Sequence, residues 1–266
     1  MMWGASLIGV SGAEKVDISW EDYLKRIVPI GAMFAGVLWL GNAAYLYLSV
    51  SFIQMVKAFM PVLVYFVGLG FGLERFRVTK LGILVMIVTG VAIASYGEVH
   101  FVVHGFLLLC ASLVLESLRV CSLQVLLQRA GLKLNPFQTL MYIAPVTGGF
   151  LLPFAMLLEG GKIVRTGPPL TLSFALVMIT NASIALALNV TVFKVIKGQS
   201  ALSLNVAGVI KDWLLIVLSY VLYHSPVTGT QVFGYGLAFV GVFVYNMIKN
   251  QDRKREAASQ AAGGSK

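Results

Sequence analysis

Eight long apolar stretches follow one another along this chain, separated by short polar segments. Each is about 20 residues long, the length an α-helix needs to cross the hydrocarbon layer of a membrane. Only helices and closed barrels satisfy their backbone hydrogen bonds in lipid, and barrel strands are only about ten residues long with alternating polarity. We therefore predict an all-α, polytopic transmembrane helix bundle with spans at 27–48, 50–72, 79–97, 102–127, 138–158, 170–193, 201–223 and 231–248.

The composition and the placement of charge support this interpretation. Charged residues make up 12% of the chain, against about a quarter in soluble domains, which excludes a water-soluble fold. Outside the spans or at their ends, fifteen Lys and Arg residues lie on the side of the N-terminus and two on the other side. The positive-inside rule then places both termini in the cytosol. This uneven charge also explains the net charge of +9 without a nucleic-acid partner.

Three regions follow from the spans. We expect residues 1–26 to form an amphipathic cytosolic lead-in, residues 27–248 a transmembrane domain of eight helices, and residues 249–266 a disordered, basic cytosolic tail. The loops between spans are too short for an extramembrane catalytic domain.

The sequence contains no recognisable catalytic or metal-binding motif. No nucleophile triad, phosphate-binding glycine loop or pair of catalytic carboxylates occurs, so the chain does not look like an enzyme. All three histidines lie outside the spans or at the edge of one, and the i,i+4 pair His100 and His104 has no third ligand in its loop. We expect neither a metal site nor a cofactor.

Five ionisable residues lie well inside the predicted spans, away from their ends, where a charge costs roughly 2.5–3.5 kcal/mol on insertion scales and often marks a substrate path. Glu116 and Arg119 are three residues apart and share one helix face, so we expect a structural ion pair, with a gating role as the alternative. The other three are Lys57, Lys211 and Asp212.

Lys211 and Asp212 are adjacent, so their side chains project about 100° apart and cannot pair face to face. Lys57 lies four residues before Pro61, which has no N–H to bond the Lys57 carbonyl, so the helix should kink beside this lysine.

Each half of the chain thus carries one lysine-bearing span, followed by a turn and a span rich in glycine. Repeated halves with a central substrate site are common in transporters.

Two buried lysines at similar depth would repel each other in an empty site, and an anion between them would remove that repulsion. Phosphate, pyrophosphate and carboxylate all fit. In the alternative, each lysine is paired with an acid of the protein, such as Asp212. Further residues that could line the site are Asn42, Tyr45, Gln54, Tyr142, Asn189 and Asn205.

Several motifs resemble a known family. They are "WLGNAAYLYLSVSFIQMVKAFMPV" (39–62), "LKLNPFQTLMYIAP" (132–145), "ALNVTVFKVIKGQSALSLNVAGVIKDW" (187–213) and "FGYGLAFVGVFVYN" (233–246). They closely resemble plant-type members of the triose-phosphate translocator and nucleotide-sugar transporter family, in the drug/metabolite transporter superfamily, and point to the branch with Lys-Asp in the ninth helix.

The resemblance implies a fold of ten helices in two inverted repeats and an alternating-access antiporter, commonly in Golgi or plastid membranes. The first span here matches the family's third helix, so the resemblance implies that two N-terminal helices are absent. In the plastid phosphate translocators a lysine in the fourth helix and a Lys-Arg pair in the ninth bind phosphate. Lys57 and Lys211 fall on those positions, and Asp212 replaces the arginine.

One cation fewer favours a nucleotide sugar, exchanged for a nucleoside monophosphate, over a plain triose phosphate. Lys57 and Lys211 would hold phosphate, while Asp212, Asn205 and Tyr142 would hold the sugar or base or set the charge balance. The alternatives are a sugar-phosphate or organic-anion/phosphate exchanger on the same fold, and a truncated, non-transporting membrane protein. We expect the Golgi membrane, with the plastid envelope or endoplasmic reticulum as alternatives. The expected partners are an anionic sugar, the lipid bilayer and a second copy of the chain in a homodimer.

Overall fold

The computed structural model describes residues 19–74, 76–99, 101–129, 136–158, 160–161, 165, 167, 171–198, 211, 214–221 and 228–263. The side chains of 127–129, 136–139, 186, 188–198 and 253–263 lie outside that description. In this part of the chain the named elements are α1 (Trp20–Asp22), a π-helical turn η1 (Tyr23–Ile27), α2 (Val28–Ala44), α3 (Val50–Lys57), α4 (Met60–Gly70), α5 (Val78–Tyr96), α6 (Val103–Arg129), α7 (Pro136–Leu158), α9 (Leu172–Gly198) and α11 (Gly229–Gly263).

Six helical stretches among the described residues are long and apolar enough to cross a membrane. They are Trp20–Ala44, Val50–Gly70, Val78–Tyr96, Val103–Leu126, Leu140–Leu158 and Gly229–Asp252. Each agrees with one predicted span to within a few residues, except that the first begins at Trp20 because α1, η1 and α2 are continuous. The chain is a polytopic helical membrane protein, as predicted.

The remaining two predicted spans are described only in part. The span at 170–193 falls on α9, where the described apolar stretch runs over Leu172–Ala185. The span at 201–223 lies largely outside the described residues, but Lys211 and residues 214–221 are helical.

The C-terminal region differs from the prediction of a disordered tail, because α11 continues without a break through Gly263. Its sequence beyond Lys249 is rich in Lys, Arg, Glu, Gln and Ala, which all favour helix. Asp252 further ties this part of the helix to α5 through ion pairs with Arg77 and Lys80.

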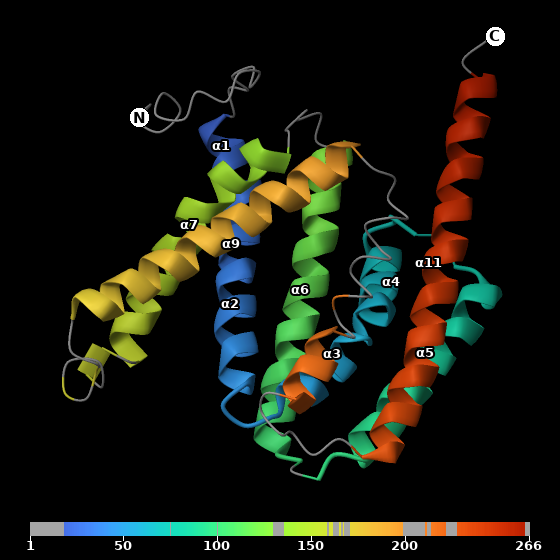
Figure 1. Ribbon diagram of the computed structural model, residues 1–266. Helices are drawn as coiled ribbons and strands as arrows, with labels where there is room; N and C mark the ends of the chain where they lie inside the picture. Colours follow the sequence, from blue (N-terminus) through green and yellow to red (C-terminus); the bar gives the residue numbers. More distant parts are fainter. Residues whose placement is uncertain are drawn as a thin grey trace.

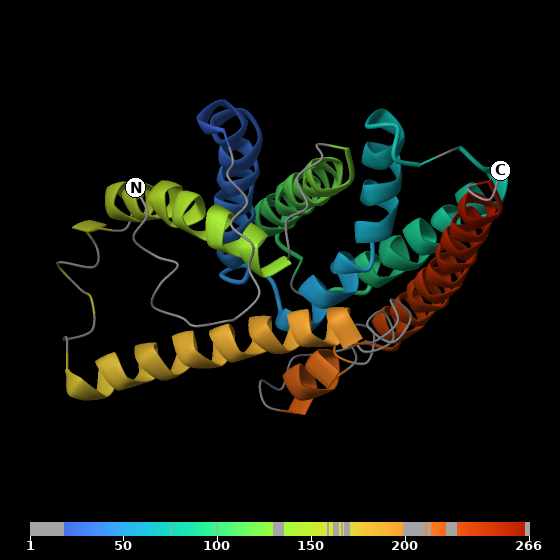
Figure 2. The same cartoon turned by 90° about the horizontal axis from the view of Figure 1, so that it is seen from above.

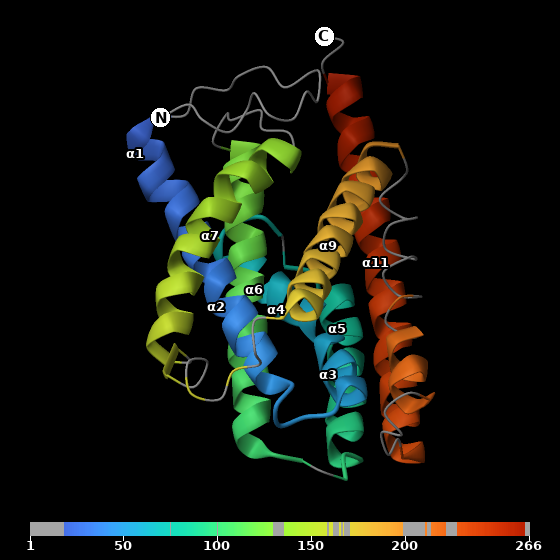
Figure 3. The ribbon, with the colours of Figure 1, turned by 60° about the vertical axis from the view of Figure 1, so that its left-hand side comes forward.

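Two groups of helices make up the bundle (Figure 1). In one group α11 lies beside α5 along the length of α5, and in the other α2 packs against α6 and α7 (Figure 3). α4 contacts both α6 and α5 and so joins the groups. The largest buried cluster lies where they meet and includes Phe52, Tyr65, Leu84, Ile87 and Ala238.

The two ends of the bundle differ in charge. We call the end that carries Arg77, Lys80 and Lys249 the basic end; α4 and the apolar part of α11 finish there, and α5 starts there. At the opposite end α2 finishes and α3 begins.

Candidate substrate site

The candidate site is built on an interrupted helix. α3 ends at Lys57, Ala58 and Phe59 form a turn, and α4 begins at Met60 with Pro61 in its first turn. In the turn, the Ala58 and Phe59 amides donate to carbonyls three residues back, at 3.1 and 2.9 Å. The kink predicted beside Lys57 is therefore present, and the ribbon bends there (Figure 2). Pro61 leaves the Lys57 carbonyl without its usual helical donor.

The Lys57 ammonium lies against Tyr45, the residue that follows α2. Lys57 Nζ donates to the Tyr45 hydroxyl oxygen at 3.3 Å and lies 5.6 Å from the centre of the ring. Gln54 Nε2 donates to the same oxygen at 3.2 Å. Three of the predicted site residues thus meet at one point, two from α3 and one from the turn after α2.

Burial changes along α3. Residues 51–56 are buried, whereas Lys57 is half-buried and Tyr45 is 37% exposed. In the described part of the chain, Lys57 has Tyr45 as its hydrogen-bond partner and no carboxylate within ion-pair distance. A cation at this depth without a protein acid is suited to binding an anion.

The segment that carries the second lysine packs against α3. Ser51 Oγ donates to Ser219 Oγ at 3.0 Å, and Met55 and Ile216 share a buried cluster with Ala94 and Tyr235. The residue number rises along α3 as it falls along the partner segment, so the two run antiparallel. Lys211 precedes Ser219 by eight residues and is exposed. The lysine therefore lies on the segment that packs beside α3, toward the Lys57 end.

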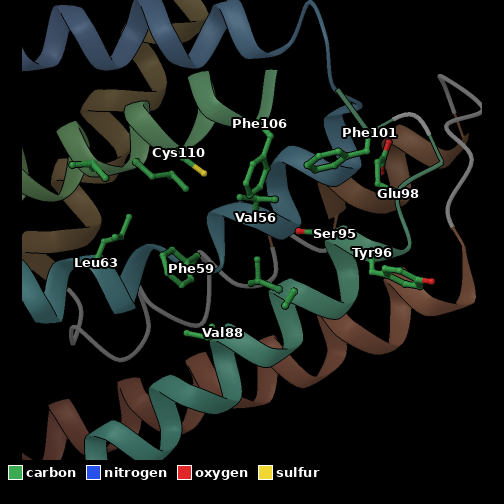
Figure 4. Close-up of a pocket in the computed structure, with 14 residues that line it drawn as sticks. Val56, Phe59, Leu63, Val88, Ser95, Tyr96, Glu98, Phe101, Phe106 and Cys110 are labelled. Carbon is green, nitrogen blue, oxygen red and sulfur yellow. The ribbon is translucent and has the colours of Figure 1, made fainter. Parts of the chain in front are cut away.

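A cavity of about 750 Å³ lies beside the same broken helix, between α4, α5 and α6 (Figure 4). Its lining is mostly apolar and includes Val56, Phe59 and Phe106, with Ser95 and Glu98 at one end. Lys57, Tyr45 and Gln54 are not part of this lining. Its chemistry does not suit a phosphate, so we place the candidate anion site at Lys57 and Tyr45.

Comparison with known proteins identifies the family of the chain. A model of the Triose-phosphate Transporter family matches residues 1–246. A probable sugar phosphate/phosphate translocator of Arabidopsis thaliana, At5g25400, is 43% identical over 249 residues, which cover 94% of this chain and 71% of the relative. A second from the same plant, At5g11230, is 44% identical over 91% of this chain and 68% of the relative. The chain belongs to the triose-phosphate transporter family.

Other predicted site residues of this transporter-family chain are separated from Lys57 or lie outside the description. Tyr142 packs edge-on to Tyr23, with ring centres 6.4 Å apart, in a cluster with Ile27 and Ile30 at the start of α2. Tyr45 follows the end of that helix, roughly 25 Å away at 1.5 Å per residue. The structure therefore does not bring Tyr142 to Lys57.

Asn42 lies one turn before Tyr45 and is exposed. Its backbone carbonyl accepts a hydrogen bond from the Tyr45 amide at 3.1 Å. The backbone of Asn189 belongs to α9, but its side chain is outside the description. Asn205 and Asp212 both fall outside the described residues.

The ion pair predicted within α6 is present. Arg119 donates from Nε to Glu116 Oε2 at 2.7 Å and from its terminal nitrogen to Oε1 at 2.5 Å. The guanidinium also lies 4.5 Å from the centre of the Phe34 ring on α2. The pair thereby links α6 to α2, and its purely structural role stays a prediction.

At the basic end, the sequence did not reveal a cluster of five charges. Lys80 is 4% exposed and lies 2.9 Å from Glu74 and 3.2 Å from Asp252. Arg77 also pairs with Asp252, and Lys249 with Glu74. Partial burial raises the pKa of Glu74. The hydrogen bond from Lys80 and the charge of Lys249 lower this pKa by more than burial raises it, so it lies below its ordinary value.

At the opposite end, a buried carboxylate was also missed. Glu98 accepts from Ser49 Oγ at 3.5 Å and from Gln231 Nε2, so it joins the start of α3 to α11. Because Glu98 and Lys80 both stand near predicted span ends, they read in the sequence as ordinary loop charges. Nothing in their spacing signals burial.

Proposed function

We propose that this chain is a secondary active antiporter that exchanges an anionic, phosphate-bearing sugar across an internal membrane. The observation that carries the proposal is the half-buried Lys57, which donates to the Tyr45 hydroxyl oxygen and has no acid within ion-pair distance in the described part of the chain. Membership of a family of transporters supports it. In this proposal, Lys57 and Lys211 bind the phosphate from two segments that pack side by side.

Two substrate classes have separate support. Asp212 favours a nucleotide sugar exchanged for a nucleoside monophosphate. Its carboxylate reduces the positive charge of the site and supplies an acceptor for sugar hydroxyls or base N–H groups. The relatives favour a sugar phosphate exchanged for phosphate, because proteins 42–44% identical to this chain are named probable sugar phosphate/phosphate translocators. Asn205, Tyr142, Asn42 and Asn189 are proposed to contribute contacts in one state of the transport cycle.

Lys211→Ala tests the two-lysine site. We expect uptake into proteoliposomes to fall to background, because one lysine alone leaves much of the phosphate charge uncompensated. Lys25→Ala is the matched control, since Lys25 is an exposed lysine paired with Glu21 on the first helical stretch. Vesicles preloaded with phosphate or with uridine monophosphate, offered labelled sugar phosphates or nucleotide sugars, separate the two substrate classes. Unchanged uptake by Lys211→Ala would refute the proposed site.

The proposal also covers the orientation of the chain and the membrane in which it lies. Both termini face the cytosol in this proposal, since the basic residues gather on the side of the N-terminus, and the proposed location is the Golgi membrane. A C-terminal tag that protease removes from intact vesicles checks the orientation.

A further inference from the structure

The Tyr45 hydroxyl has an unusual set of partners. Its oxygen accepts two hydrogen bonds, from Gln54 Nε2 at 3.2 Å and from Lys57 Nζ at 3.3 Å. A phenol oxygen has two lone pairs and one proton, so both acceptor positions are occupied. The O–H proton is left to point away from both donors. Among the described residues, the Tyr45 hydroxyl donates to no acceptor.

The position of this hydroxyl is well defined. The turn after α2 is held by hydrogen bonds from the amides of residues 45, 46 and 47 to the carbonyls three residues back, each at 3.1 Å. The next residue, Leu48, is buried in the main cluster. Gln54 is also buried, at 6% exposure, on the capped first helix of the interrupted span. The phenol is therefore oriented before any ligand arrives, which lowers the entropic cost of binding.

The side-chain groups that meet at the Tyr45 oxygen are all hydrogen-bond donors. Lys57 contributes N–H donors, Gln54 contributes an amide N–H₂, and Tyr45 contributes the remaining O–H. In the described part of the chain these three groups have no carboxylate beside them. Such a set is complementary to an oxyanion, which accepts several hydrogen bonds at once.

We propose that Tyr45 is a specificity-determining residue that donates its hydroxyl proton to an oxygen of the bound phosphate, beside the Lys57 ammonium. The inference rests on the proposed function, and it adds a neutral donor that recognises the shape of the oxyanion as well as its charge. The Tyr45 oxygen accepts from Lys57 and Gln54, and its proton is left for the phosphate, so the hydroxyl links the ammonium to the anion.

A different role for the same contact has the opposite consequence. If Tyr45 only held Lys57 in a resting position, its hydroxyl would compete with the substrate for the ammonium. Removing the hydroxyl would then leave anion affinity unchanged or increase it. The direction of the change in affinity therefore separates the two roles.

Tyr45→Phe is the test, because it removes the hydroxyl and keeps the ring beside Lys57. We expect the Kd for inorganic phosphate and for uridine monophosphate, measured by calorimetry on the purified full chain in nanodiscs, to rise at least about tenfold, the loss typical of one hydrogen bond to a charged group. Tyr47→Phe is the matched control: Tyr47 is two residues away, is 42% exposed and packs edge-on to His104 rather than Lys57.

A third variant, Lys57→Met, distinguishes the outcomes. Loss of binding in Lys57→Met, together with an unchanged or tighter Kd in Tyr45→Phe, would overturn the role of Tyr45 and leave the proposed anion site intact. Parent-like affinity in Lys57→Met, or no binding of either anion by the parent, would overturn the proposed site and this inference with it. Equal weakening in Tyr45→Phe and Tyr47→Phe would also count against a specific donor.

Discussion

The interrupted helix at Lys57 and the pair formed by α5 and α11 are opposite solutions to packing inside a membrane. The first breaks its own hydrogen-bond ladder at Pro61 and leaves a cation and donors half-exposed. The second brings two unbroken helices together so closely that their backbones touch.

Small residues make this close approach. A Cβ added at Gly90 would lie 2.6 Å from the Gly234 carbonyl oxygen, and one added at Gly234 would lie 2.6 Å from the Gly90 carbonyl oxygen. Each helix carries the same spacing of small residues, in "GVAIASYG" (90–97) and "GYGLAFVG" (234–241). Such residues let helices associate through van der Waals contact where lipid removes the hydrophobic driving force.

Polar contacts hold the same pair at both ends. At the basic end, Asp252 of α11 pairs with Arg77 and Lys80. At the opposite end, Thr228 Oγ1 donates to the Gly97 carbonyl at 2.9 Å, and Gln231 donates to Glu98. The pair therefore has no room for a ligand along its length, whereas the broken helix presents groups that a ligand can satisfy. Stability and recognition lie on different helices.

Gly90→Ala should break the tight pair and give the largest effect. The added methyl group meets the backbone of α11, so the helices must separate, at a cost of about 1–3 kcal/mol or more. Thermal unfolding of the purified protein in detergent measures the loss. Gly236→Ala on α11 is the matched control, because its Cβ would meet nothing within 4 Å and alanine favours helix. Equal melting temperatures for the two variants would contradict the close contact.

Pro61→Ala tests the other region. An N–H at this position can bond the Lys57 carbonyl, so the helix can continue through the turn and carry Lys57 away from Tyr45. We expect the free energy of unfolding to change by only about 1 kcal/mol, because proline is tolerated in a first helical turn. Phosphate affinity should fall a few-fold. Pro153→Ala, inside α7, is the control for removing a proline and should leave affinity unchanged. Affinity equal to that of the parent in both variants would show that the break is not needed for binding.

The smallest expected effect concerns Glu74 and pH. Its pKa in the folded protein is lowered from the ordinary 4.5, so its contribution to stability is present above that value and is lost as the pH falls through the folded-state pKa. The groups that face it are Lys80 and Lys249, whose charge does not change in this window. We expect a loss of about 1 kcal/mol below pH 4.5, seen as a drop in melting temperature that Glu74→Gln reduces. A variant that follows the parent at every pH would exclude this contribution.

Much of the helix layout could be predicted from the sequence because membrane helices satisfy their hydrogen bonds internally. The apolar runs predicted six described spans, Pro61 predicted the break beside Lys57, and the i,i+3 spacing predicted the ion pair of Glu116 and Arg119. Each of these follows from neighbours a few residues apart. The tail is the exception: polarity suggested disorder, but helix-forming residues and the contacts of Asp252 continue α11 to Gly263.

Contacts between distant spans depended on the tertiary structure. The sequence showed a glycine-rich span in each half, but only the packed helices place Gly90 opposite Gly234. In the same way, Tyr142 is a plausible site residue by type, but it lies at the other end of α2 from Tyr45.

The sequence by itself determined the membrane class, the helices and the charges that must find partners, since these depend on local polarity and local hydrogen bonding. Only the tertiary structure decided which partners they find. Lys80 is enclosed by Glu74 and Asp252, although Asp252 is 172 residues further along the chain. Lys57 meets Tyr45 because a turn returns the chain beside its own preceding helix. Helix packing determines both sets of partners, and no sequence pattern within a single helix predicts how helices pack.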